Sequence, residues 1–278
     1  MAPHRRSINL KDGSVAFLDW GGHAPAIHFA HANGFNAQTY RTLLSPLADA
    51  FHVLASDARG HGFTELPAEP SLAKGWSTLC DDLLGFLNAV HDGPMILAGH
   101  SLGAVASLVL AVNHPDKVKG LVLVEPVLVP EGPAGESNPG PALAALTRRR
   151  RAHFSSYDEV LKAYRGRAAF ETWPEEVLAD YLKDGLKPDG DGVRLACLPA
   201  WEAAIYDNTY IGAAKLAAQV QCPITLIYGD SDSTVPDSET AIMAAAKARL
   251  VKVPGASHFL PMEQPEIVRA EIRRMAGM

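Results

Sequence analysis

One serine lies at the centre of the pentapeptide GHSLG, residues 99–103, within an otherwise apolar stretch of the chain. Residues 95–97 suit a strand covered on both faces, and residues 104–112 have the length and small side chains of a packed helix. The two glycines remove Cβ atoms that would collide where the strand turns sharply into the helix. Such a turn presents the Ser101 hydroxyl, which predicts a nucleophile. A helix-capping serine without chemistry is the alternative.

A serine nucleophile needs a base that removes its proton and a carboxylate that orients the base. His258 follows a predicted strand at residues 250–253 and lies among small residues, so we predict it as the base. Two carboxylates, Asp230 and Asp232, follow another predicted strand. We predict Asp232 as the orienting acid and Asp230 as a brace of the turn. The order Ser, Asp, His along the chain then distinguishes this arrangement from other serine hydrolases.

Eight apolar stretches of strand length would position these groups. The first two flank Asp12-Gly13, a hairpin signal, and are expected to be antiparallel. Later strands alternate with helical patterns, which favours a mostly parallel eight-stranded sheet flanked by helices, an α/β fold. The strands are expected at residues 7–11, 15–20, 26–30, 52–56, 95–98, 118–124, 223–228 and 250–253. Helices are expected near residues 40–48, 77–90, 102–112 and 238–248 and after residue 265.

Residues 127–218 break this alternation. They contain no continuous apolar strand, many charges and several aromatic residues, after a Pro/Gly/Ser-rich entry at residues 130–141. We predict a helical insertion that lies over the sheet, with its aromatic side chains partly packing and partly lining a pocket. The core domain would then comprise residues 1–126 and 219–278.

Four motifs together resemble the α/β-hydrolase superfamily over essentially the full chain: GHSLG at 99–103, DARGHG at 57–62, GDSD at 229–232 and GASH at 255–258. In that superfamily the acid usually stands third after the glycine that follows the seventh strand, which selects Asp232. Some members place the acid after the sixth strand instead, so Glu125 is kept as an alternative. The resemblance also implies that residues 127–218 are the variable cap, or lid, domain.

The same resemblance implies an oxyanion hole made of two backbone amides. One belongs to the residue after the nucleophile, Leu102. The other comes from the loop after the third strand, where members usually carry His-Gly-X and this chain has HANGF at residues 31–35. Alignment on the histidine makes Asn33 the second donor. A shifted loop would use Gly34 or Phe35 instead.

Other residues of these motifs are expected to have structural or binding roles. His31 is predicted to brace its loop, and Asp57, Arg59 and His61 to lock the loop after the fourth strand. The predicted substrate pocket is lined by Phe35, His100, Glu125, Trp173, Trp201, Tyr206 and Phe259.

Composition limits the classes of partner. The chain has 278 residues, 47% of them hydrophobic, and a net charge of −6, which gives no electrostatic reason to bind nucleic acid or an anionic membrane. The Arg148–151 run is read as a solvated helix face in preference to an anion site. Three widely spaced cysteines and the absence of a secretory signal favour the cytoplasm. No membrane span, metal or cofactor is expected, and the oligomeric state is not predicted.

The motifs predict acyl transfer to Ser101, with His258 as base and then acid. The leading hypothesis is a serine esterase that hydrolyses a carboxylic ester or related small, apolar acyl substrate. A serine in place of an aspartate argues against epoxide hydrolase or dehalogenase chemistry. C–C bond hydrolysis of a diketone is the alternative reaction, and a hydrolase-fold small-molecule receptor with little turnover is the alternative class.

Overall fold

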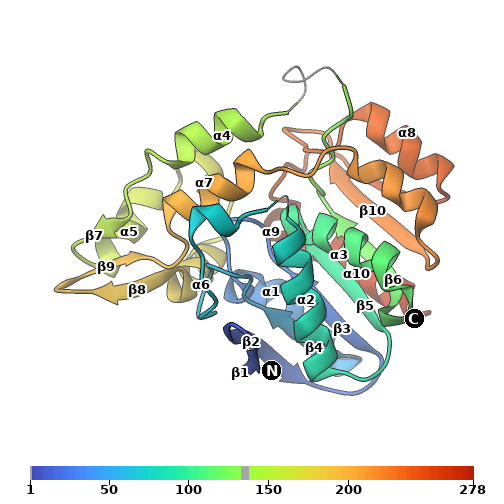
Figure 1. Ribbon diagram of the computed structural model, residues 1–278, viewed down its shortest axis with the longest axis horizontal. Helices are drawn as coiled ribbons and strands as arrows, with labels where there is room; N and C mark the ends of the chain where they lie inside the picture. Colours follow the sequence, from blue (N-terminus) through green and yellow to red (C-terminus); the bar gives the residue numbers. More distant parts are fainter. Residues whose placement is uncertain (1, 75, 133–137) are drawn as a thin grey trace.

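A single eight-stranded sheet forms the centre of the computed structural model, which describes residues 2–74, 76–132 and 138–278 (Figure 1). The strand order is β1-β2-β4-β3-β5-β6-β10-β11. Only β1–β2 and β2–β4 pair in antiparallel fashion, so the predicted mostly parallel α/β sheet is confirmed. The strands are β1 (His4–Leu10), β2 (Gly13–Gly21), β3 (Ala26–Ala30), β4 (His52–Ser56), β5 (Met95–His100), β6 (Val118–Val124), β10 (Ile224–Gly229) and β11 (Arg249–Val253).

Helices cover both faces of this sheet, which explains why strands β3 and β5 are buried at every position. Successive side chains point to opposite faces, so Leu97 and Leu121 belong to one core cluster and Ile96 and Val122 to the other. Helices α2 (Ser77–Val90), α3 (Leu102–Asn113) and α8 (Asp237–Ala245) contribute to the first cluster. Helices α1 (Arg41–Leu44) and α10 (Pro265–Met275) contribute to the second. Other short elements are α9 (Leu260–Glu263), η1 (Ala37–Tyr40), η2 (Ser45–Asp49), η3 (Pro70–Leu72), η4 (Pro115–Lys117) and η6 (Ala213–Gln219).

The segment between β6 and β10 contains helices and also a small sheet that the sequence analysis did not predict. Its helices are α4 (Gly140–Thr147), α5 (Tyr157–Tyr164), η5 (Ala168–Phe170), α6 (Glu175–Gly185) and α7 (Pro199–Asp207). Three antiparallel strands, β7 (His153–Phe154), β9 (Gly192–Leu195) and β8 (Leu186–Asp189), project at one end of the molecule (Figure 1). Residues 133–137, part of the Pro/Gly/Ser-rich entry, lie outside the described residues. The strands are short and polar, so periodicity does not reveal them.

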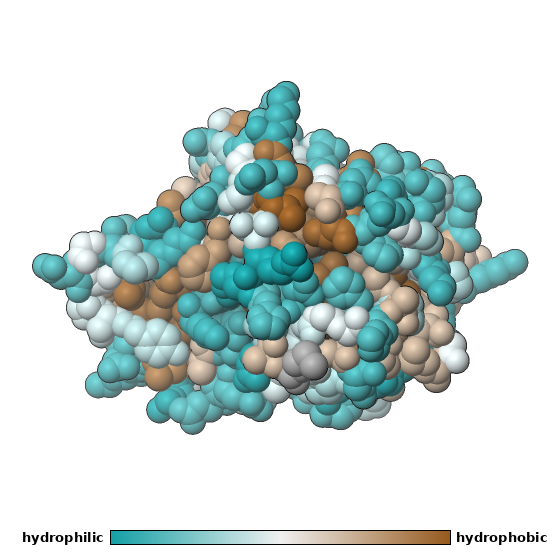
Figure 2. Space-filling view, turned by 90° about the horizontal axis from the view of Figure 1, so that it is seen from below, coloured by the Kyte–Doolittle hydropathy of each residue, from teal (hydrophilic) through white to brown (hydrophobic). Residues whose placement is uncertain are grey.

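The outer surface is mostly hydrophilic on the face that Figure 2 shows, with apolar side chains gathered in a few patches. Within the described ranges, every helix is too short or too polar to cross a membrane.

Candidate active site

The strand-to-helix turn holds Ser101 in a conformation that L-residues rarely adopt. Its φ is +55° and its ψ −117°, and its amide donates to the Val124 carbonyl at 3.0 Å. A Cβ on Gly99 would lie 2.6 Å from the backbone of Gly103, and one on Gly103 would lie 2.2 Å from the Ala30 carbonyl oxygen. Both approaches are shorter than atoms tolerate, so the turn requires glycine at both positions, as its sequence predicts.

Ser101 and His258 line one cavity of about 650 Å³. Its floor includes Asn33 and Thr234 from loops of the sheet, and the segment between β6 and β10 supplies charged and aromatic side chains. This volume suits a small-molecule substrate. The structure therefore brings the predicted nucleophile and the predicted base to one cavity at the carboxyl edge of the sheet.

Glu125 supplies the carboxylate that contacts the base. Its Oε2 lies 3.3 Å from Nδ1 of His258, and the Glu125 side chain is completely buried. The carboxylate also accepts hydrogen bonds from the Gly229 amide at 2.6 Å, the Ser233 hydroxyl at 2.8 Å and the Thr234 amide at 2.9 Å. Burial by itself would raise the pKa of Glu125, but the hydrogen bonds from His258 and the two amides hold it below its usual value. Glu125 is therefore an ionised group in contact with His258 Nδ1.

Asp232, the predicted acid, is not brought to His258. It is exposed, lines the cavity, and has no hydrogen-bond partner for its side chain among the described residues. Of the two candidate carboxylates, Glu125 and not Asp232 therefore contacts the predicted base. The predicted brace, Asp230, does hold the turn, since its carboxylate accepts the Gly255 amide at 2.7 Å.

Strand register explains the contact between Glu125 and His258. His100 at the end of β5 pairs with Val124 at the end of β6, so the residues that follow them, Ser101 and Glu125, lie side by side. Strand β6 also neighbours β10, and the Glu125 amide donates to the Ile227 carbonyl at 2.8 Å. From this position the Glu125 side chain extends into the loop after β10. That loop contains Asp232, which the sequence predicts as the orienting acid.

The loop at residues 31–35 leaves one amide available. Within it, the amides of Ala32, Gly34 and Phe35 donate to Tyr40 Oη at 3.1 Å, to His61 Nε2 at 2.9 Å and to the Ala32 carbonyl at 3.1 Å. No acceptor for the Asn33 amide occurs within the described ranges. The Leu102 amide begins helix α3, where an amide has no acceptor within the helix. These contacts favour the predicted pair, Asn33 and Leu102, over Gly34 or Phe35.

Two neutral histidines join this loop to the loop after β4. His31 accepts the Ala58 amide at Nε2 (2.8 Å) and contacts the Ala32 carbonyl through Nδ1 (2.7 Å). His61 accepts the Gly34 amide and contacts the Arg59 carbonyl through Nδ1 at 2.9 Å. Each ring therefore carries its proton on Nδ1 and braces backbone, as expected for both residues.

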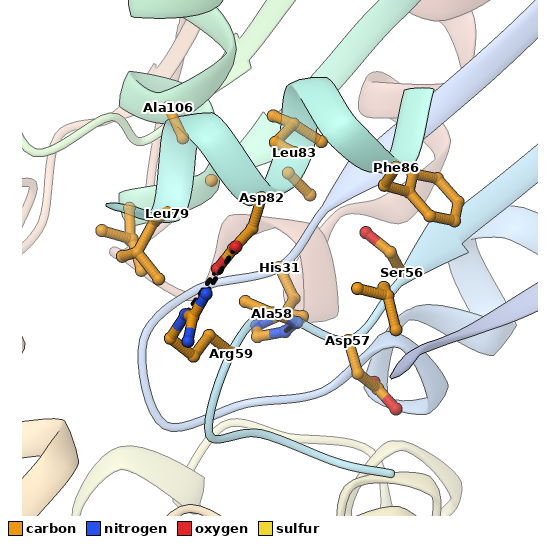
Figure 3. Close-up of a pocket in the computed structure, with 14 residues that line it drawn as sticks. His31, Ser56, Asp57, Ala58, Arg59, Leu79, Asp82, Leu83, Phe86 and Ala106 are labelled. Carbon is orange, nitrogen blue, oxygen red and sulfur yellow. Dashed lines mark hydrogen bonds and ion pairs between the residues drawn. The ribbon is translucent and has the colours of Figure 1, made fainter. Parts of the chain in front are cut away.

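A second, much smaller cavity of about 40 Å³ lies beside these braces (Figure 3). Figure 3 shows His31 near the ion pair between Arg59 and Asp82, whose Nε and Oδ2 atoms are 2.7 Å apart. Asp57 lines the same space and accepts the Ala37 and Phe63 amides. These groups are held by one another, so this cavity belongs to the scaffold of the site.

Comparison with known proteins decides the family. A model described as the alpha/beta hydrolase family matches residues 29–271. The chain belongs to the α/β-hydrolase family. It is 28% identical over 88% of its length to 2-(acetamidomethylene)succinate hydrolase of Mesorhizobium japonicum, covering 86% of that protein. It is 29% identical over 91% of its length to pimeloyl-[acyl-carrier protein] methyl ester esterase of Chromobacterium violaceum, covering 95% of that protein.

A solved structure agrees with this family at the level of the fold. The crystal structure of E-2-(acetamidomethylene)succinate hydrolase superposes with a TM-score of 0.86 at 24% identity, over 99% of this chain and 100% of the other.

Three of the predicted pocket residues of this α/β hydrolase line the cavity: Phe35, Tyr206 and Phe259. The other four, His100, Glu125, Trp173 and Trp201, are not among the residues that line it. Trp201 donates Nε1–H to the Arg59 carbonyl at 2.8 Å and packs over Gly60. Trp173 packs edge-on against Phe35 and Phe259, behind the lining. These tryptophans join the inserted segment to the core.

His100 instead links parts of the site. The Ala32 amide donates to Tyr40 Oη, and this hydroxyl lies 2.7 Å from His100 Nδ1. On the other side of the ring, Nε2 lies 2.8 Å from the His258 carbonyl oxygen. Because that carbonyl can only accept, Nε2 carries the proton and Nδ1 accepts from Tyr40. Continuous hydrogen bonds thus join the loop at residues 31–35 to His258, an arrangement that no local pattern signals.

Sequence reasoning also missed polar residues of the inserted segment that line the cavity: Tyr164, Arg167, Tyr181, Glu202 and, from the basic run, Arg150. Arg148 pairs with Asp207 and Arg151 with Glu159 on the exposed surface, as a solvated face would. Arg150 points to the cavity instead. The basic run is the available signal in the sequence, but only the fold shows which of its members lines the cavity.

Proposed function

We propose that this α/β hydrolase is a serine hydrolase that cleaves a carboxylic ester or related acyl substrate through an acyl-enzyme. The observation that carries the proposal is the shared cavity of Ser101 and His258, together with the buried Glu125 carboxylate at His258 Nδ1. A strained serine, an imidazole and an orienting carboxylate are the components that acyl transfer requires.

In the proposed reaction, Ser101 Oγ attacks the acyl carbon while His258 Nε2 accepts the hydroxyl proton. The amides of Leu102 and Asn33 stabilise the negative oxygen of the tetrahedral intermediate. His258 then gives its proton to the leaving alcohol as the bond to the acyl carbon breaks. Water, deprotonated by His258, attacks the acyl-enzyme and releases the acid and free Ser101. Glu125 stabilises the imidazolium formed in each half-reaction.

The comparisons support hydrolysis and leave the substrate open, since the named relatives act on an acetamidomethylene succinate and on a methyl ester. Epoxide hydrolases also occur among the relatives. Ser101 occupies the position where epoxide hydrolase chemistry needs a carboxylate nucleophile, which favours acyl transfer for this chain. We further propose that residues 127–218 act as the cap that selects the substrate.

The direct test is Ser101→Ala, assayed with a series of p-nitrophenyl esters of increasing acyl length. We expect turnover to fall to the uncatalysed rate and labelling by a fluorophosphonate probe to disappear. The variant should keep the circular dichroism and melting temperature of the parent. Retained turnover in the folded variant, or a parent that neither labels nor hydrolyses any ester, would overturn the proposal.

A further inference from the structure

The side of the cavity formed by the inserted segment is rich in hydrogen-bond donors. Arg150, Arg167 and the tyrosines 164, 181 and 206 line it, whereas Glu202 is the only carboxylate that this segment contributes among the described lining residues. Guanidinium groups donate and never accept, and tyrosine hydroxyls readily donate. A purely apolar substrate would leave these donors without partners. The segment between β6 and β10 therefore adds hydrogen-bond donors to the apolar and aromatic side chains of the cavity.

Arg150 has more N–H donors than its contacts with the protein use. Its Nη1 lies 2.5 Å from Glu202 Oε2, and its Nη2 lies 3.4 Å from the Tyr164 hydroxyl, a long contact. A guanidinium has five N–H donors in a fixed fork, so donors of Arg150 remain beyond its contacts with Glu202, Tyr164 and Tyr181. The pair with Glu202 is monodentate, which leaves an edge of the fork for a second carboxylate.

The position of Glu202 places this fork beside the reacting centre. Its backbone carbonyl accepts the Asn33 side-chain amide at 3.0 Å, and its carboxylate lies 2.7 Å from the point where a Cβ of Gly34 would be. Glu202 thus packs directly on the oxyanion loop, and Arg150 contacts Glu202. Arg150 and Ser101 line the same cavity, so one substrate could contact both groups.

A second cation shares the cavity. Arg167 lines it, is exposed, and has no acceptor for its side chain among the residues that the structure describes. An exposed cation at the cavity attracts negatively charged substrates over a distance of about 8–10 Å at ordinary ionic strength. Arg167 and Arg150 therefore offer an anion a point of entry and a point of binding.

We propose that Arg150, supported by Arg167, forms a carboxylate-binding subsite, so that the preferred substrate is an acyl compound carrying a second, ionised carboxylate near the scissile carbonyl. This inference rests on the proposed function, because it names the substrate class of the same site.

Matched esters test the substrate class. The methyl half-esters of succinate, glutarate and adipate are compared, by titration of released acid, with neutral methyl esters of equal chain length. We expect the parent to prefer half-esters, and Arg150→Met to reduce the ratio of kcat/KM for half-ester over neutral ester about ten- to hundredfold. Arg150→Lys should recover part of the ratio, since it keeps the charge without the fork. Arg149→Met, an exposed neighbour outside the cavity, should leave both rates unchanged.

Binding is measured separately from turnover. Glutarate is titrated calorimetrically into Ser101→Ala and into Ser101→Ala carrying Arg150→Met. Because Arg150→Met leaves the buried Glu202 unpaired, a further variant with both Arg150→Met and Glu202→Gln guards against misfolding. Loss of glutarate binding in the folded Arg150 variants supports the subsite even where no ester is turned over. An unchanged ester ratio in the Arg150 variants, or equal glutarate binding with and without Arg150, overturns it.

Discussion

The two halves of the cavity are built in different ways. The core half is formed by residues at the carboxyl ends of buried parallel strands. Hydrogen bonds between strands β5 and β6 hold Ser101 and Glu125 side by side. The other half comes from short helices and a small sheet with mixed polar and aromatic side chains, among them Arg150 and Glu202. The core half therefore suits chemistry that needs fixed geometry, whereas the inserted half can change its lining without disturbing the sheet.

This contrast predicts different kinetic signatures. Substitutions in the core half should lower kcat for every ester alike. Substitutions of Arg150 should change the ratio between charged and neutral esters.

The largest effect is expected for Glu125→Gln, which removes the charge that stabilises the His258 imidazolium. We expect kcat to fall by about 10³- to 10⁴-fold for all esters, with little change in KM. Asp232→Asn is the matched control, because this carboxylate lines the cavity without contacting His258. The steady-state kcat of each folded variant is compared with that of the parent. A far greater loss in Asp232→Asn than in Glu125→Gln would return the role of the acid to Asp232.

Local patterns were sufficient to predict most of the core. The sheet, the turn at Ser101 and the place of His258 at the same cavity follow from apolar periodicity, from glycines flanking a serine, and from a histidine after a strand. The acid depends on tertiary structure, because strands β6 and β10 are neighbours and a carboxylate from either could reach His258. Only the observed contact separates Glu125 from Asp232.

The inserted half is less predictable for a different reason. Strands β8 and β9 are short and polar. The Asp189-Gly190 step between them is a hairpin signal, but the polar residues on either side do not read as strands. Large aromatic residues suggest a pocket but also pack helices together, as Trp173 and Trp201 do. Which arginine of a basic run faces the cavity depends on the packing of α4 and α7 rather than on local sequence.

A second prediction concerns the pH dependence of the core half. Burial lowers the pKa of His31 to about 4 and that of His61 to about 3, and both rings must stay neutral to accept backbone amides. In the unfolded chain these histidines titrate near 6.5, so below that pH the unfolded state binds more protons than the folded state. The free energy of unfolding should therefore fall as pH falls from about 6.5 to about 4.

The size of that loss is on the order of 2 kcal/mol per histidine at pH 5. Urea unfolding at pH 7, 6 and 5 measures it. The variant His61→Asn, which cannot gain the proton, should show a shallower slope over the same range. Parallel slopes in parent and variant would mean that His61 is not held neutral by the fold.

The smallest effect tests the chain of hydrogen bonds through His100. Tyr40→Phe removes one hydroxyl and leaves the Ala32 amide and His100 Nδ1 without this partner, at a cost of about 1–3 kcal/mol in the free energy of unfolding. If these hydrogen bonds also position the loop at residues 31–35 and His258, kcat should fall about tenfold for charged and neutral esters alike, with KM unchanged. A purely structural hydroxyl would lower stability and leave kcat as it was. A decrease in kcat that affects only charged esters would instead show that Tyr40 influences the substrate preference assigned to Arg150. The proposed separation of roles between the two halves of the cavity would then be wrong.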